Sequence, residues 1–241
     1  MNVLAIGNSF SEDATRYLHA IARADGKILN VANLYIGGCP LERHYRNMLS
    51  NERAYELQYN GEKTGFPVSL NEALLNRSWD IITLQQASLQ SFKAESYEPY
   101  ISALAEHIRK CQPKAKIYIH QTWAYENGSD RLLNLAKYES FDAMLSDVKE
   151  CYKKAYEAIR ADGLIPSGEM LGSLLKNGIP TVHRDTFHAS RGIGRYALGL
   201  IWYRALFGAD VSENTFSDFD EEISTEDIKT AKKCANALCK S

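Results

Sequence analysis

The stretch LAIGNSFS, residues 4–11, decides the expected fold. A short apolar run ends at Gly7, Ser9 follows two residues later, and a helical pattern begins near Glu12 and extends to about Ala24. This order of strand, tight turn and helix is typical of an open α/β sheet, which binds ligands at the carboxyl ends of its strands. Backbone N–H groups at the start of a helix favour negative charge there. Ser9 is therefore either an ordinary helix-capping residue or a nucleophile.

The whole chain has the composition of a globular protein. Its 241 residues are 45% hydrophobic and 24% charged, and no Pro/Gly/Ser-rich linker interrupts them, so we expect a single domain over residues 1–241. A net charge of −2 provides no basic surface for nucleic acid, and the apolar runs are too short to span a bilayer. We therefore expect neither nucleic acid nor a membrane as a partner, and the sequence leaves the oligomeric state open.

The cysteines and the start of the chain bear on the compartment. Five cysteines without CxxC spacing argue against a disulfide framework or a zinc site and favour reduced thiols in a cytoplasmic protein. The sequence does not begin with the charged and then apolar segments of a signal peptide. If a leader has been removed from the given chain, the protein would instead be secreted or periplasmic. Cys39, between Gly38 and Pro40, is expected to be a small buried residue rather than a thiol nucleophile. Cys234 and Cys239 are expected on a late helix.

Apolar, β-rich runs alternate with helical patterns along the chain, which favours an α/β fold with a parallel sheet. Four or five strands are too few for an eight-fold barrel, so we expect a three-layer α/β/α sandwich with a flavodoxin-like sheet of about five strands. A β-hairpin within residues 51–67 is an option, because that segment has no clean period. The main strands are expected over residues 2–6, 28–36, 81–84 and 116–120, and the main helices over residues 12–24, 69–76, 141–161, 191–207 and 225–239.

Polar clusters follow the ends of the expected strands. Because the carboxyl ends of parallel strands meet at one edge of a sheet, we expect these clusters to form a single pocket. Trp123 either stacks on the face of a sugar or covers the core. The residues expected to bind substrate are Gln121, Thr122 and Trp123.

Asp185 and His188 have the spacing of an acid–base pair. A serine hydroxyl needs a neighbouring base, and the base needs an acceptor on its other nitrogen. One helical turn places residues i and i+3 side by side, so Asp185 can bind Nδ1–H of His188 and leave Nε2 facing a serine. Alternatively, His188 is an ordinary helix-start histidine with Asp185 as its cap. His183 together with these two residues could instead bind a metal, although no fourth ligand is evident.

Acyl transfer also requires hydrogen-bond donors aimed at the oxyanion. The candidates are the N–H of Ser9, the N–H of Gly38 or Gly37, and a side-chain amide from Gln85 or Gln86. A glutamine at the end of an apolar strand is unusual, because a buried amide must be hydrogen-bonded. It either completes an oxyanion hole or binds a neighbouring loop.

Three of these motifs resemble the SGNH (GDSL-type) hydrolase superfamily. Residues 7–10, GNSF, resemble its first block, Gly37-Gly38 falls where the second block supplies an oxyanion glycine, and residues 185–188, DTFH, resemble its last block. The order matches over about residues 2–207 and is most similar to the carbohydrate-esterase-like branch. The third block departs from the family pattern, since QQAS at residues 85–88 replaces Gly-x-Asn-Asp. We transfer the role of its asparagine to a glutamine, with Gln85 as the first choice and Gln86 as the second.

The resemblance implies a serine esterase that uses neither a metal nor an organic cofactor. Ser9 would attack the ester, His188 would act as base and then as acid, and Asp185 would orient His188. The implied substrate is an acetylated carbohydrate or a similar polar ester. The altered third block keeps a second hypothesis open, a non-catalytic carbohydrate-binding protein on the same fold, and a metal-dependent hydrolase is a third.

Overall fold

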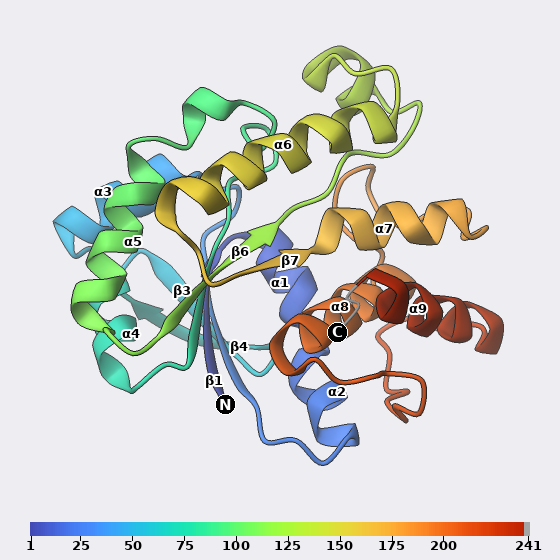
Figure 1. Cartoon of the computed structure of the whole chain (residues 1–241), viewed down its shortest axis with the longest axis horizontal. Helices are drawn as coiled ribbons and strands as arrows, with labels where there is room; N and C mark the ends of the chain where they lie inside the picture. Colours follow the sequence, from blue (N-terminus) through green and yellow to red (C-terminus); the bar gives the residue numbers. More distant parts are fainter. Residues whose placement is uncertain (239–241) are drawn as a thin grey trace.

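A central β-sheet with helices on both faces organises the molecule (Figure 1). The computed structural model describes residues 1–238. Its strands form one seven-stranded sheet in the order β4-β3-β2-β1-β5-β6-β7. Strands β2, β1, β5, β6 and β7 are parallel, whereas β3 is antiparallel to β2 and β4 is antiparallel to β3. The strands are β1 (Asn2–Gly7), β2 (Asn30–Tyr35), β3 (Tyr55–Tyr59), β4 (Glu62–Val68), β5 (Ile81–Leu84), β6 (Lys116–Gln121) and β7 (Gly163–Pro166).

The predicted α/β class and parallel sheet are confirmed, but the expected number of about five strands was too low. The five parallel strands match that expectation, and the hairpin offered as an option within residues 51–67 adds β3 and β4 at the sheet edge. Asn60 and Gly61 turn this hairpin, both with positive φ, as a tight hairpin turn requires. Most of β4 is exposed, so its sequence lacks the apolar alternation by which strands are usually predicted.

The helices form two layers, one on each face of the sheet (Figure 1). Helices α3 to α6 pack against one another on one face, and α8 contacts α1, α2, α7 and α9 on the other. The helix predicted over residues 225–239 is α9, described as far as Leu238; Cys239 lies outside the described residues. The helices are α1 (Ser9–Thr15), α2 (Leu18–Ala24), α3 (Leu41–Ser50), α4 (Leu70–Asn76), α5 (Tyr100–Cys111), α6 (Phe141–Ile159), α7 (Ser167–Lys176), α8 (Ile193–Phe207) and α9 (Thr225–Leu238), with a 3₁₀ turn at Ala94–Ser96 and a π-helix at Arg131–Ala136.

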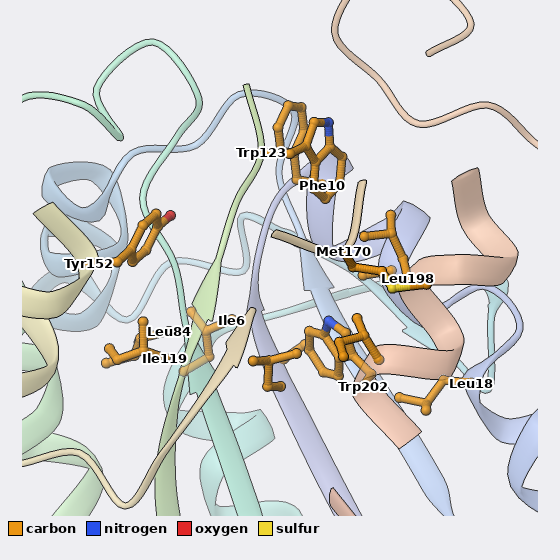
Figure 2. Packing of buried hydrophobic residues seen from close by; sticks show 14 of the residues in the cluster. Ile6, Phe10, Leu18, Leu84, Ile119, Trp123, Tyr152, Met170, Leu198 and Trp202 are labelled. Atoms are coloured by element: carbon orange, nitrogen blue, oxygen red, sulfur yellow. The ribbon is translucent and has the colours of Figure 1, made fainter. Parts of the chain in front are cut away.

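Apolar side chains fill both interfaces between sheet and helices (Figure 2). Trp202 and Leu198 of α8 lie with Met170 of α7 on one side of the sheet, and Tyr152 of α6 lies on the other. Burial of such side chains is the main source of stability in a fold of this kind.

The chain order places a crevice at the carboxyl end of β1. The chain leaves β1 for β2 on one side, and β5 later pairs with the other side of β1. Open α/β sheets bind ligands at such a switch in strand order. Ser9 follows β1 at this point, with Asn8 as the one residue between them.

Among residues 1–238, no helix combines the length and the apolar character needed to cross a membrane.

Candidate active site

Ser9 lies in the first turn of α1, immediately after β1. Asn8 caps this helix, because its Oδ1 accepts a hydrogen bond of 3.0 Å from the N–H of Phe10. Gly7 is required by close packing: a Cβ at this position would lie 2.9 Å from Oε1 of Gln85 and would also clash with Ser11. The tight turn thus fixes the direction in which the Ser9 hydroxyl leaves the sheet edge.

The structure brings Ser9, His188 and Asp185 into one chain of contacts. Nε2 of His188 lies 2.8 Å from Oγ of Ser9, across 179 residues of sequence. Nδ1 of His188 lies 2.8 Å from Oδ2 of Asp185, whose Oδ1 accepts the backbone N–H of His188 at 2.9 Å. Because a carboxylate only accepts, Nδ1 carries the proton and Nε2 is left to accept the proton of the Ser9 hydroxyl.

The environment keeps Asp185 ionised. Burial alone would raise the pKa of Asp185, but hydrogen bonds from the side chain and backbone of His188 outweigh it, so that this pKa is lowered. A carboxylate that stays charged at neutral pH can hold the imidazole in one tautomer and stabilise a positive charge on it.

Ser9 and His188 open into a cavity of about 370 Å³. Phe10 and Phe187 provide apolar surface, and Gly37 and Gly38 line the same cavity as Ser9. Gly38 has a positive φ of 61°, which a glycine adopts without strain. The cavity is lined by Asn8, Ser9, Phe10, Glu12, Tyr35, Gly37, Gly38, Ser88, Arg184, Phe187 and His188.

Sequence comparison assigns the chain to a family. The family model described as a domain of unknown function, DUF4886, matches residues 2–238. The chain belongs to the DUF4886 family. A crystal structure of a DUF4886 protein from Bacteroides uniformis superposes with a TM-score of 0.90 at 33% identity, covering 98% of this chain and 93% of that one. No match was found among curated proteins.

More distant solved structures share the fold of this DUF4886 protein. A proposed SGNH hydrolase from Slackia heliotrinireducens superposes with a TM-score of 0.62 at 21% identity, covering 86% of this chain and 98% of that one. A proposed GDSL-like lipase from Parabacteroides merdae superposes with a TM-score of 0.56 at 13% identity, covering 85% of this chain and 94% of that one. The DUF4886 chain therefore has the fold of SGNH hydrolases, as the resemblance of its motifs implied.

Gln85 lies behind the DUF4886 site rather than in it. Its Nε2 donates to Oδ1 of Asn8 at 2.9 Å, and its Oε1 lies 2.7 Å from Nδ1 of His120. Burial lowers the pKa of His120 to about 3, so this histidine is neutral and donates through Nδ1. Gln85 thus supports the cap of α1, and the prediction that its amide faces the oxyanion is corrected.

Gln86 is engaged in the same way, by backbone groups at the start of α3 and in the 3₁₀ turn at Ala94–Ser96. Its Oε1 accepts the N–H of Leu41 at 3.0 Å, and its Nε2 donates to the carbonyl oxygen of Ser96 at 2.9 Å. Gln86 is fully buried and does not line the cavity. Neither predicted glutamine donor therefore reaches Ser9.

The three predicted substrate-binding residues are also buried supports in this DUF4886 protein. Trp123 and Thr122 are completely inaccessible, and none of the three lines the cavity that contains Ser9. Trp123 stacks on Phe10 at 4.0 Å, and its Nε1 donates to the carbonyl oxygen of Phe187 at 2.8 Å. Of its two predicted roles, Trp123 therefore has that of covering the core. Gln121 instead borders a groove of about 770 Å³ between α6 and α7.

His183 and Cys39 are both held away from the reaction centre. Nε2 of His183 lies 3.0 Å from the carbonyl oxygen of Ala124, whereas Asp185 and His188 bind each other, so the three do not form one ligand set. Among residues 1–238, no group of three His, Cys, Asp or Glu side chains is arranged to hold a metal ion. Burial raises the pKa of Cys39 to about 12, so its thiol is a poor nucleophile.

Several residues at the site were not predicted from the sequence. Glu12, Tyr35 and Phe187 line the cavity, and Ser88 lies beside them. Ser88 is the last residue of the altered third block, and its place in the loop that follows β5 is the signal that could have singled it out.

Proposed function

We propose that this protein is a serine esterase that removes small acyl groups, acetyl first among them, from a carbohydrate or a similar polar scaffold. The observation that carries the proposal is the continuous contact from Ser9 through His188 to Asp185, with 2.8 Å between successive side chains. Both distances lie within the range required for proton transfer between a nucleophile, its base and the orienting acid.

In the proposed first half-reaction, Oγ of Ser9 attacks the ester carbonyl while Nε2 of His188 takes the hydroxyl proton. Asp185 stabilises the imidazolium that forms. The N–H groups of Ser9 and Gly38 donate to the negative oxygen of the tetrahedral intermediate. As the C–O bond breaks, His188 returns its proton to the leaving alcohol, and an acyl group remains on Ser9.

In the second half-reaction, water replaces the alcohol. His188 removes a proton from the water, and the resulting hydroxide attacks the acyl carbonyl. Collapse of this second intermediate releases the carboxylic acid, and the proton on His188 returns to Ser9. Bonds and protons balance, because one ester and one water give one acid and one alcohol.

The size of the cavity supports a small acyl group. About 370 Å³ is at the low end of the range for ligand sites, which runs from about 300 to 1,000 Å³. The cavity mixes aromatic rings, from Phe10 and Phe187, with the charged side chains of Glu12 and Arg184. Such a mixture suits a polar acceptor that carries a short acyl chain.

The test is hydrolysis of p-nitrophenyl acetate, butyrate and octanoate and of acetylated xylo-oligosaccharides by the wild type and by Ser9→Ala. We expect the acetyl esters to be preferred and Ser9→Ala to lose about 1,000-fold or more in kcat. Ser102→Ala, a serine on the outer part of α5 that binds Glu98, is the matched control and should retain wild-type turnover. Undiminished turnover by Ser9→Ala would exclude the proposal.

The hypothesis of a non-catalytic carbohydrate-binding protein makes a different prediction. It expects calorimetric binding of xylo-oligosaccharides without release of acetate and without labelling of Ser9 by a fluorophosphonate. The esterase proposal expects one equivalent of label, lost in Ser9→Ala.

A further inference from the structure

Ser88 places a hydroxyl group in the same cavity as Ser9. It follows β5, is half-buried, and lines the cavity together with Gly38 and His188. Its Oγ accepts a hydrogen bond of 3.0 Å from the hydroxyl of Tyr125. Oγ of Ser88 makes no other hydrogen bond within residues 1–238. Its own proton is therefore available to a group in the cavity.

Tyr125 is held as a donor to Ser88. Its side chain is completely inaccessible, and burial raises its pKa, so the phenol stays protonated. The guanidinium of Arg131 lies 5.5 Å from the centre of the Tyr125 ring, within the range of a cation–π contact. The phenol proton of Tyr125 points to Oγ of Ser88.

The Tyr125 hydroxyl donates to Ser88, whose own hydroxyl is the next donor in the chain. Hydrogen bonds in such a chain polarise one another, which makes the last O–H a stronger donor. Arg131 is itself fixed, because its guanidinium also lies 3.8 Å from the centre of the Phe187 ring. Arg131 is the first residue of the π-helix Arg131–Ala136, a local irregularity that is frequent at functional sites.

We propose that the Ser88 hydroxyl is the third donor of the oxyanion hole, in the place left open by Gln85 and Gln86. Both glutamine amides are engaged elsewhere, whereas Ser88 lines the cavity that contains Ser9. A serine hydroxyl is among the side chains that serve this role in enzymes. The inference rests on the proposed esterase function and names a catalytic residue for it; Tyr125 and Arg131 are positioning residues that act through Ser88.

The principal test compares Ser88→Ala with the wild type on p-nitrophenyl acetate. A donor used only in the transition state should lower kcat by about 100-fold while KM changes by less than about threefold. The inhibition constant of phenylboronic acid, which forms a tetrahedral adduct on the serine, should rise by a similar factor to kcat/KM. Ser88→Thr retains a hydroxyl and should recover most of the activity.

Two further variants separate catalysis from packing. Tyr125→Phe leaves Ser88 without its polarising donor, and we expect a loss of kcat between about 3- and 10-fold. Ser91→Ala is the matched control on the same loop: its Oγ binds the backbone carbonyl of Ser88 at 2.9 Å and does not line the cavity. It should keep kcat within about twofold, because Ser91 does not line the cavity in which the reaction takes place.

The outcomes distinguish this inference from the proposed function. If Ser9→Ala is inactive but Ser88→Ala keeps wild-type kcat and boronate affinity, the role of Ser88 is overturned and the esterase stands. A loss in Ser91→Ala equal to that in Ser88→Ala would assign the effect to loop packing and also overturn it. If Ser9→Ala is fully active, the proposed function fails, and the role of Ser88 fails with it.

Discussion

Nη1 of Arg184 lies 2.9 Å from both carboxylate oxygens of Asp13. Asp13 is completely buried, and it also accepts Nε of Arg195 at 2.9 Å and the backbone N–H of Ala189 at 3.1 Å. It stands four residues after Ser9 on α1, whereas Arg184 and Ala189 flank the segment that carries Asp185 and His188. One buried carboxylate therefore joins the helix of the nucleophile to the loop of its base.

Replacing Asp13 by alanine should destabilise the protein and separate these two elements. Two arginines and one backbone N–H would lose their acceptor, and breaking such a buried pair costs about 3–5 kcal/mol. We expect this loss in the free energy of unfolding measured in urea. We also expect kcat to fall by at least about tenfold at temperatures where the variant is folded, because the Ser9–His188 distance is no longer fixed.

Asp142→Ala provides the control for loss of a carboxylate. Asp142 pairs with Lys176 at 3.1 Å, but its side chain is 60% exposed. Exposed pairs of this kind contribute at most about 1 kcal/mol, and kcat should not change. Equal costs for the Asp13 and Asp142 variants would contradict the role assigned to Asp13.

Asp220 makes stability depend on pH. Its carboxylate accepts Nη2 of Arg16 at 2.7 Å and Nη1 of Arg195 at 2.7 Å, and hydrogen bonds from Arg16 are the largest cause of a pKa well below its ordinary 3.8. A carboxyl group whose pKa is lowered on folding stabilises the fold above its unfolded pKa. That stability is lost as the pH falls toward the lowered folded pKa.

The measurement is the melting temperature of the wild type and of Asp220→Asn as a function of pH. At neutral pH the wild type should melt at a higher temperature than the variant, by an amount equivalent to about 1 kcal/mol of unfolding free energy, since the ion pair is only partly buried. The difference should be complete above about pH 5 and shrink below pH 4. Asp218→Asn, an exposed neighbour, controls for charge alone. A difference that stays constant from pH 7 to pH 2.5 would rule out this linkage.

The parts of the site that follow local rules could be predicted from the sequence. A strand, a tight turn and a capped helix place Ser9. A spacing of three residues brings Asp185 against His188, although the two lie in a bent loop rather than in the helical turn that we expected. The hydrogen bonds of the Gln85 side chain instead involve Asn8 and His120, which lie at the ends of two other strands, β1 and β6. Nothing in the local pattern specifies that choice. The same holds for Asp13, whose three partners, Arg184, Ala189 and Arg195, come from a loop and a helix that lie 171 to 182 residues later.

Gln85→Leu tests the supporting role of this glutamine. The change removes the acceptor of His120 Nδ1–H and one donor to Asn8, both in a buried setting. Leaving buried polar groups unsatisfied costs about 1–3 kcal/mol, to be measured as a lower free energy of unfolding. Because the Gln85 amide does not face the cavity, kcat should fall less than about tenfold.

The half-buried Gln90 on the following loop supplies the comparison for Gln85. Gln90→Leu should change stability by no more than about 0.5 kcal/mol. The opposite pattern for Gln85→Leu, unchanged stability with kcat reduced by about 100-fold, is what removal of an oxyanion donor would produce. That result would return Gln85 to the role first predicted for it.

Trp123→Phe should loosen the loop that carries His188 without removing any contact to substrate. Phenylalanine can keep the stacking on Phe10 but lacks the Nε1–H that binds the carbonyl oxygen of Phe187, the residue before His188. We expect a cost of about 1–3 kcal/mol in unfolding free energy and a loss of kcat of several-fold. The change in KM should be the same for p-nitrophenyl acetate and for an acetylated oligosaccharide, because Trp123 is inaccessible.

Trp79→Phe is the matched control, since its Nε1 also donates to a backbone oxygen, that of Ala73 at 2.9 Å, but far from Ser9. It should show a similar stability cost with unchanged kcat, whereas a rise in KM confined to the oligosaccharide in Trp123→Phe would restore the tryptophan as a sugar-stacking surface.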